Sequence, residues 1–391
     1  MYIGRIKLFL AAFLLVLVTG VGSVTLFLYG MTGDPYSALR LWGGMQIIST
    51  QFFEPVDNRK LVDGAIKGMI ESLGDPYSAY MDEKTYRDFL NQTEGSFSGI
   101  GIELGKKDNR LTVIAPITGT PSERAGIRSG DVILKIDGVD VEGLSLDEII
   151  NRIRGKEGTP ITLLLERLNP EKANAPESFE VALTRESIVI QTIHGQMLQE
   201  GVGYVRISSF NKNTAEHFAS KLTELDQQGM KRLVLDLRNN PGGLLDSSVK
   251  IAGLLMKEGD VVSTVTRDGQ KITQRSGGEK DRYQAVVVLI NGGSASASEV
   301  VAGALQDREV GTLVGTTSFG KGSVQMLFPT DIGPQSAFRL TIARYFTPNG
   351  RSIHGTGLAP DVWVDWSGEG PAGVLGTDPQ MQKAVEVLLA K

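Results

Sequence analysis

The first part of the chain contains its longest uninterrupted apolar run. Arg5 and Lys7 precede Leu8–Gly33, a stretch of 26 residues without a charged side chain. A helix of about 20 apolar residues spans the hydrocarbon core of a membrane, and positive charge before the span keeps its N-terminus inside. The pattern predicts a signal anchor over residues 1–33, with the rest of the chain outside the cytoplasm.

A cleaved signal peptide is the alternative interpretation of this run. Its apolar region normally has about 7–15 residues and is followed by a small-x-small cleavage site. The run is longer here, and Val18–Ser23 (VTGVGS) is a weak match to such a site. We favour the membrane anchor; cleavage would instead give a secreted or periplasmic protein, so both interpretations predict export.

A helical pattern follows in residues 34–94. Its apolar residues recur at four-residue steps, which predicts one buried helix face: Leu61, Ala65, Met69 and Leu73. Gly74-Asp75-Pro76 is expected to end this helix. We interpret the region as a packing or dimerisation element that carries no chemistry.

Short strands and glycine turns then replace the helical pattern, from residue 95 to residue 185. Ser145 and Glu148 form a capping box before a helix with apolar residues at helical spacing. Asn169–Glu177 is predicted to be a loop. Ser98–Leu104 is predicted to be a glycine turn that runs into a strand, and Pro121–Ala125 a short helical turn. The other expected strands are Leu111–Ala115, Asp131–Ile136 and Thr162–Glu166.

This block resembles a bacterial-type PDZ domain in its SGIGIEL and PSERAGIRSGDVILKIDG segments and in the helix after Ser145. The resemblance implies that the ligand is an extended C-terminal peptide. A glycine-rich turn can direct backbone N–H groups at a terminal carboxylate while a strand edge pairs with the peptide. The expected contacts are Ser98, Gly99, Ile100, Gly101 and Ile102, with Arg154 at the helix end helping to sense the peptide.

Residues 186–391 alternate between strands and helices, which indicates an α/β domain. Ala285–Ile290 (AVVVLI) is a continuous apolar strand of the kind that is buried on both faces. The other expected elements are strands Gly203–Ser208 and Arg232–Leu237, and helices Thr214–Gln228, a segment after Gly243, and Ser296–Gln306.

The segment AVVVLINGGSASASEVVAGALQD, from Ala285 to Asp307, is the first with catalytic potential. A buried strand runs through two glycines and small residues into a helix, which places Ser296 at a strand-to-helix turn. Backbone N–H groups at such a turn can bind a developing oxyanion. Serine is also a favoured helix cap, so spacing alone leaves a structural role open.

The segment GTTSFGKGSVQ, from Gly315 to Gln325, nearly matches a phosphate-binding loop, but Gly322 stands where Ser or Thr is required and a strand follows. Lys321 lies in a glycine loop, and Gln325 shares its face if the segment is extended. A surface lysine is the ordinary interpretation. A lysine enclosed by small residues can instead lose solvent, acquire a lowered pKa and act as a base.

A third segment, LVLDLRNNPGGLL from Leu233 to Leu245, is a buried strand that ends in two asparagines, a proline and two glycines. Glycine permits close backbone approach to a ligand, and its N–H can complete an oxyanion hole. A simple strand-to-helix turn is the alternative.

Together these segments resemble the C-terminal processing peptidases, also called tail-specific proteases. GYVRISSF at Gly203, DPYSAY at Asp75, YFTPNGRSIHGTGLAPD at Tyr345 and DPQMQKAVEVLL at Asp378 extend the resemblance over nearly the whole chain after the anchor. It implies a crotonase-like α/β protease core with an inserted PDZ domain.

The resemblance also implies residue roles. Ser296 would be the nucleophile, Lys321 the base, and Gln325 the residue that orients the lysine. Backbone N–H groups of Gly242 and Ala297 would form the oxyanion hole, and Asp307 would be structural. No metal or cofactor is required, the partners are peptide or protein substrates with free C-termini, and a homodimer is expected.

Composition restricts the remaining alternatives. The net charge of −5 argues against a nucleic-acid binder, and the lack of cysteine excludes disulfides, thiolate metal sites and a cysteine nucleophile. A triad hydrolase would need one of three histidines: His194, His217, which we expect to be solvated, or His354, which we expect at the rim of the site. A non-catalytic PDZ scaffold is the alternative from another functional class.

Overall fold

The computed structural model describes residues 2–107, 110–169, 175–199, 201–278, 281–330, 335–366, 373 and 375–391. The chain divides into two compact units. The first comprises residues 1–82 with Phe328–Leu340, and the second comprises Glu83–Leu327 with Thr341–Lys391.

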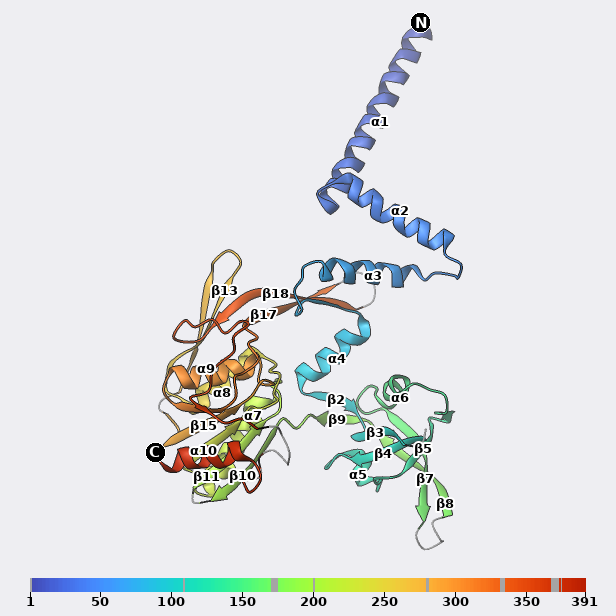
Figure 1. Cartoon of the computed structure of the whole chain (residues 1–391). Helices are drawn as coiled ribbons and strands as arrows, with labels where there is room; N and C mark the ends of the chain where they lie inside the picture. The colour runs from blue at the N-terminus through green and yellow to red at the C-terminus, as the bar shows by residue number, and fades with distance from the viewer. Residues whose placement is uncertain are drawn as a thin grey trace. The chain divides into compact units, whose positions relative to one another are not determined.

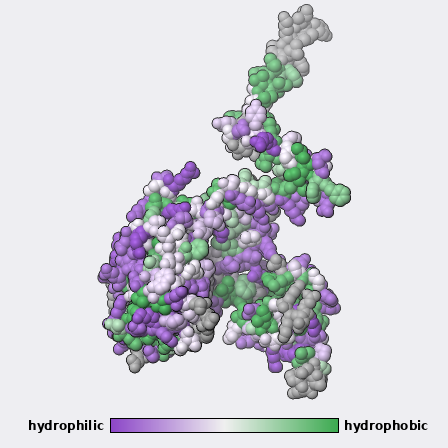
Figure 2. Space-filling view, viewed as in Figure 1, coloured by the Kyte–Doolittle hydropathy of each residue, from purple (hydrophilic) through white to green (hydrophobic). Residues whose placement is uncertain are grey.

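The first unit is mainly helical (Figure 1). Its elements are α1 (Tyr2–Thr32), α2 (Pro35–Gln51), α3 (Asn58–Glu71) and β1 (Ala79–Met81), and β1 pairs antiparallel with Ala337–Arg339 of β18 (Ser336–Phe346). Within α1, Phe13–Gly30 is long and apolar enough to cross a membrane, judged by length and composition. Hydrophobic residues cover the described surface of this helix (Figure 2).

The helix face predicted for α3 is wrong. Met69 and Leu73 are 56% and 61% exposed, whereas Ile70 is buried. An α-helix turns once in 3.6 residues, so apolar residues at successive four-residue steps drift around the helix instead of sharing one line. Leu73 also lies beyond the end of α3 at Glu71.

In the second unit, one six-stranded sheet follows the order β3-β4-β5-β7-β8, with β6 paired to β5. The capping box before α6 is confirmed, since Ser145 N donates to Glu148 Oε2 at 2.8 Å and Glu148 N to Ser145 Oγ at 3.3 Å. The bounds are β3 (Ile102–Lys107), β4 (Arg110–Pro116), α5 (Pro121–Arg124), β5 (Val132–Ile136), β6 (Val139–Asp140), α6 (Leu146–Ile153), β7 (Pro160–Asn169) and β8 (Ala175–Thr184).

The loop predicted for Asn169–Glu177 is too long. β7 continues to Asn169 and β8 begins at Ala175, so both ends of the predicted loop are strand, and residues 170–174 lie outside the described part of the chain. Ten residue pairs, Pro160–Asn169 opposite Ala175–Thr184, hold these strands in one antiparallel ladder. Ladder pairing outweighs the low strand propensity of Pro176 and Glu177.

Two short strands flank this block in the sequence. α4 (Glu83–Glu94) leads into β2 (Ser96–Gly99), which pairs antiparallel with β9 (Glu186–Val189). The chain thus enters the β-rich sheet after β2 and leaves it before β9 through two strands that are paired with each other.

The α/β core is built on a six-stranded sheet in the order β10-β11-β12-β15-β16-β19. β10 is antiparallel to β11, and all other neighbours are parallel. The elements are β10 (Ile193–Gln199), β11 (Val202–Ile207), α7 (Thr214–Gln227), β12 (Arg232–Asp236), α8 (Leu245–Leu255), β15 (Ala285–Ile290), α9 (Ala297–Asp307), β16 (Gly311–Gly315), β19 (Val362–Trp363) and α10 (Pro379–Leu389).

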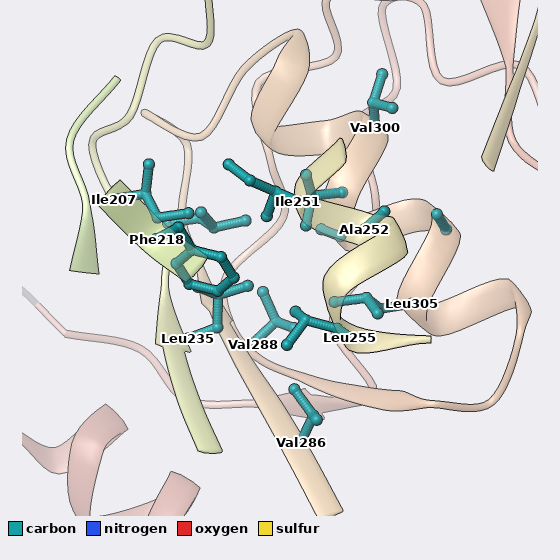
Figure 3. Packing of buried hydrophobic residues seen from close by; sticks show 14 of the residues in the cluster. Ile207, Phe218, Leu235, Ile251, Ala252, Leu255, Val286, Val288, Val300 and Leu305 are labelled. Carbon is teal, nitrogen blue, oxygen red and sulfur yellow. The ribbon is translucent and has the colours of Figure 1, made fainter. Parts of the chain in front are cut away.

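Both faces of this sheet are covered, as the apolar pattern of β15 predicts. Val286 and Val288 join residues of α7, α8 and α9 in one buried cluster (Figure 3). Val287 and Leu289 point the other way and join residues of α10 in a second cluster. Successive side chains of a strand point to opposite faces of the sheet. A strand that is buried on both faces therefore needs apolar residues at every position.

A further sheet contains β13 (Gly259–Thr266), β14 (Lys271–Ser276), β17 (Ser323–Thr330) and β18. Ala343–Phe346 of β18 pairs antiparallel with β13, which in turn pairs with β14. The structure confirms an α/β core, a β-rich insertion and a helical N-terminal segment.

Candidate active site

Ser294 and Ser296 lie between β15 and α9, and Ser298 lies in the first turn of α9; two of these three serines have structural partners. Ser294 Oγ donates to Leu237 O at 2.8 Å, and Ser298 Oγ donates to Asn240 O at 3.0 Å. Both side chains are fully buried, whereas Ser296 is only half-buried. Of the three hydroxyls, that of Ser296 is the best placed to meet a substrate.

Ser296 has an unusual backbone conformation at the start of α9, with φ 56° and ψ −115°. Such a conformation costs a residue other than glycine about 1–3 kcal/mol and often marks a functional site. Gly242 lies directly against this turn: a Cβ on Gly242 would stand 2.9 Å from Ser296 Cβ and 2.6 Å from Ala295 O. Only glycine fits there, and the glycine segment is therefore adjacent to the nucleophile candidate.

The two oxyanion-hole candidates differ in their present bonding. Gly242 N donates to Asn240 Oδ1 at 2.9 Å, so a substrate oxyanion would have to replace that acceptor. Ala297 is the first residue of α9, where backbone N–H groups have no acceptor within the helix. Both residues border Ser296.

Lys321 lies in the segment between β16 and β17 and is half-buried. Strand β17 begins at Ser323, so the helix that a phosphate-binding loop requires does not follow the lysine. Gln325 on β17 is also half-buried, and its Nε2 donates to Ser323 Oγ at 2.9 Å and to Thr341 Oγ1 at 3.1 Å.

Glu299, in the first turn of α9, joins the serine segment to the lysine segment. Its carboxylate is completely buried. Oε2 accepts from Ser296 N at 2.8 Å and from Lys321 N at 2.9 Å, so these two backbone nitrogens cannot lie farther apart than the sum of the two distances. Oε1 accepts from Gly320 N at 2.7 Å and from Ser318 Oγ at 2.6 Å.

Sequence reasoning missed this acid, although a signal was present. Ser296-Ala297-Ser298-Glu299 has the Ser-x-x-Glu spacing of a capping box, in which the glutamate returns to the N–H of the capping residue. The bond from Ser296 N follows from that pattern. The bonds from Gly320 and Lys321 do not, because they join segments about twenty residues apart.

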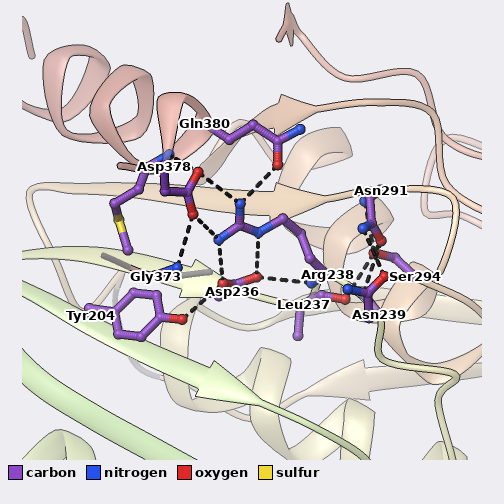
Figure 4. Close-up of polar contacts among 11 residues, drawn as sticks. Tyr204, Asp236, Leu237, Arg238, Asn239, Asn291, Ser294, Gly373, Asp378 and Gln380 are labelled. Carbon is purple, nitrogen blue, oxygen red and sulfur yellow. Dashed lines mark hydrogen bonds and ion pairs between the residues drawn. The ribbon is translucent and has the colours of Figure 1, made fainter. Parts of the chain in front are cut away.

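A second buried network, centred on Arg238, lies at the end of β12 (Figure 4). Arg238 is 2% exposed and binds three partners that are equally buried: Asp236 (2.7 and 2.9 Å), Asp378 (2.8 and 3.1 Å) and Gln380 (2.9 Å). Burial opposes the charged guanidinium, but the two carboxylates raise the pKa of Arg238 above its ordinary value.

Asp378 is also the N-cap of α10. It accepts from Met381 N at 3.0 Å and from Gly373 N at 2.9 Å. Burial alone would raise the pKa of this carboxyl, but the hydrogen bonds and charge of Arg238, together with the two backbone donors, hold the pKa below its ordinary value.

Of the five predicted peptide contacts of the PDZ block, three lie on strands β2 and β3, and Ile100 and Gly101 lie between these strands. Ser98 and Gly99 belong to β2, and the Ser98 hydroxyl is buried without a partner in the described part of the chain. Ile100 is in the hydrophobic core of the block. Gly101 has φ 72°, and Ile102 begins β3, which stands at one end of its sheet.

Arg154 directly follows α6, and its side chain contacts segments outside the sheet of this block. Its Nη1 donates to Asp88 Oδ1 on α4 at 2.9 Å. The guanidinium also lies 5.3 Å from the ring centroid of Phe97 on β2. The predicted peptide sensor is thus linked to α4, which precedes the block, and to β2 at its start.

The three histidines have different surroundings. His194 is exposed on β10, and His354 is exposed in a loop whose backbone lies against Gly322. His217 is half-buried, so the expectation that it is solvated is wrong only for its Nδ1, which is buried and has no partner in the described part of the chain.

Three family models match the chain: "Peptidase family S41" over residues 201–364, "PDZ domain" over residues 112–167, and "Activating protease CtpB N-terminal domain" over residues 40–85. The first covers the segments of Ser296, Lys321 and Gly242.

Curated relatives agree with these models. A carboxy-terminal-processing protease of Bartonella bacilliformis is 38% identical over 339 residues, which is 85% of this chain and 76% of the relative. The carboxy-terminal processing protease CtpA of Bacillus subtilis is 35% identical over 366 residues, 90% of this chain and 77% of the relative.

A solved S41 protease from Bacteroides fragilis shares the fold, with a TM-score of 0.50 at 16% identity over 88% of this chain and 96% of that protein. The family models and the curated relatives show that the chain belongs to the carboxy-terminal processing proteases of peptidase family S41, which are serine-type peptidases with a PDZ domain.

Proposed function

We propose that the protein is an extracytoplasmic serine endopeptidase that cleaves protein substrates near or from their C-termini with a Ser296–Lys321 dyad. Neutral Lys321 takes the proton of Ser296 Oγ as that oxygen attacks the scissile carbonyl carbon. The resulting acyl-enzyme is then hydrolysed by a water molecule that the same amine activates. Gln325 orients the lysine.

One observation carries this proposal: a single carboxylate oxygen of Glu299 accepts from both Ser296 N and Lys321 N. It supports a common site for a half-buried hydroxyl and a half-buried amine. A general base has to come within hydrogen-bond reach of the proton that it removes, directly or through one water.

The oxyanion hole is assigned to the N–H groups of Gly242 and Ala297. The close approach of Gly242 to the Ser296 turn and the position of Ala297 at the start of α9 support this assignment. Donors of this kind are worth about 10²–10³ in kcat. Gly242 N would exchange Asn240 Oδ1 for the substrate oxygen.

Hydrolysis of an unfolded protein by the full chain in detergent tests the dyad. Ser296→Ala and Lys321→Met should each abolish cleavage, while Ser187→Ala, which changes an exposed serine on β9, should retain it. Single replacement of His194, His217 and His354 by alanine discriminates the triad alternative, since the dyad requires none of them. Cleavage that survives in Lys321→Met contradicts the proposal.

The PDZ block is assigned to recognition of a substrate C-terminus and to gating of the active site. The position of β3 at the end of its sheet suits addition of a peptide strand. The bond from Arg154 to Asp88 supplies a connection from α6 to α4. Deletion of residues 95–185 should change both cleavage rate and substrate choice; if neither changes, the gating role is refuted.

A further inference from the structure

We propose that Asp378, on the last helix, is a positioning residue for catalysis that acts through Arg238. The inference rests on the proposed function of Ser296. Asp378 touches neither the proposed nucleophile nor the proposed base, but its carboxylate holds the guanidinium of Arg238 through both oxygens, at 2.8 and 3.1 Å (Figure 4).

The segment directly after Arg238 is hydrogen-bonded to the turn that precedes Ser296. Asn239 N donates to Asn291 Oδ1, and Asn291 Nδ2 donates to Asn239 Oδ1, both at 2.9 Å (Figure 4). Asn239 has φ 56°, so its backbone conformation is itself demanding. Leu237, the residue before Arg238, accepts from Ser294 Oγ at 2.8 Å.

Asn240 extends this connection to both sides of the proposed nucleophile. Its carbonyl oxygen accepts from Ala295 N and from Ser298 Oγ, each at 3.0 Å, and its side chain accepts from Gly242 N. Residues 237–242 therefore form one bonded unit with residues 291–298, and Arg238 lies inside that unit.

Arg238 has a full set of partners only when α10 is docked. Asp236 supplies one carboxylate, but that carboxylate also accepts from Tyr204 Oη and from Arg238 N. Loss of the Asp378 charge would leave a buried guanidinium with too little negative charge, and the side chain would move toward other acceptors. A displacement of about 1 Å at reacting groups can cost about 10²-fold in rate.

The test compares Asp378→Asn with wild type and with Leu388→Ala in the full chain. Asparagine remains a good N-cap, so the variant can keep the cap of α10 while it removes the charge that faces Arg238 and one of the two acceptor oxygens. Leu388→Ala is the control, because Leu388 is buried at the far end of the same helix and belongs to the apolar cluster of α10. Gln380→Met, which removes the acceptor at 2.9 Å, is a second variant should Asp378→Asn fail to fold.

Three quantities are measured at a temperature well below each melting point: kcat, KM and the rate of Ser296 modification by a fluorophosphonate. We expect Asp378→Asn to lower kcat and the modification rate about tenfold or more, with KM within about twofold, and Gln380→Met to show a smaller change in the same direction. Leu388→Ala should lower the melting temperature and leave kcat within about twofold.

Unchanged kcat and modification rate in a folded Asp378→Asn or Gln380→Met variant overturns the inference. So does a loss in Leu388→Ala equal to that in Asp378→Asn, because it would mark a general effect of helix docking. If wild type itself is not modified at Ser296 and Ser296→Ala still cleaves, the proposed function fails, and the inference fails with it.

Discussion

The carboxylate of Glu299 explains how the segments of Ser296 and Lys321, which are distant in sequence, are held next to each other. Four backbone or hydroxyl donors converge on its two oxygens within 2.9 Å. Tyr345 Oη adds a longer contact to Oε2 at 3.4 Å and also binds Ser296 O at 3.2 Å. A buried anion with this many donors is satisfied without a cationic partner.

Glu299→Gln should therefore inactivate the enzyme although the shape of the side chain is kept. Either orientation of the amide would place an NH2 group against two of the existing donors, which leaves buried groups unsatisfied at about 1–3 kcal/mol each. We expect a fall in kcat of about 10²-fold or more and a lower melting temperature.

The control for that substitution is Glu216→Gln on α7, where the side chain is exposed. It makes the same chemical change without altering a buried network and should leave both kcat and melting temperature unchanged. Wild-type kcat in Glu299→Gln would show that the donors rearrange around the amide and that Glu299 is dispensable.

Helix α10 covers one face of the central sheet, and its docking combines apolar and ionic contacts. Met381 and Leu388 are buried in the cluster that contains Val287 and Leu289 of β15. Its N-cap, Asp378, adds the charged contact with Arg238. The apolar contacts are independent of pH, whereas the charged one is not.

The decrease in stability at acid pH should depend in part on protonation of Asp378. Its pKa is below the ordinary value of 3.8 in the folded chain, so the unfolded chain binds the proton more readily. The stabilisation is complete above about pH 5 and is lost as the pH falls through the lower folded pKa. The melting temperature of Asp378→Asn should thus lie well below that of wild type at pH 7, and the gap should narrow toward pH 3.

A constant gap between wild type and Asp378→Asn across this range would mean that the charge of Asp378 adds nothing to stability. Leu388→Ala provides the comparison, because removal of an apolar side chain should lower the melting temperature by a similar amount at every pH.

Elements with a strong local pattern were predictable from sequence. The bounds predicted for β15 are those observed, because its uninterrupted apolar run suits burial on both faces. The segments proposed for catalysis could also be singled out, because small residues and glycines at strand ends are visible in the sequence; their catalytic roles stay predictions. The contacts of Glu299 and the pairing of Arg238 with Asp378 could not be predicted from the sequence, because each joins segments that only tertiary folding brings together.

At the level of the whole molecule, we propose that the apolar helix α1 keeps the protein in the membrane. Its window Phe13–Gly30 has the length and composition of a membrane span, and Arg5 and Lys7 precede it. We expect the mature protein to keep residues 1–33 and to remain in the membrane fraction after a high-salt wash.

Intact mass of the protein from the membrane fraction checks this expectation. A chain that begins at Asp34 is the control and should be recovered in the soluble fraction. A mature N-terminus near Ser23 would instead identify the segment as a signal peptide.

The left-handed backbone of Ser296 implies that the proposed active site lowers the stability of the folded protein. Glycine adopts φ 56° without the steric penalty that alanine and serine incur. Among inactive variants, Ser296→Gly should therefore be more stable to unfolding than Ser296→Ala by about 1 kcal/mol. At Ser298, inside α9, the order should reverse, because glycine is a poor helix former. Chemical denaturation of these four variants would give the difference in free energy of unfolding that the backbone conformation of Ser296 causes.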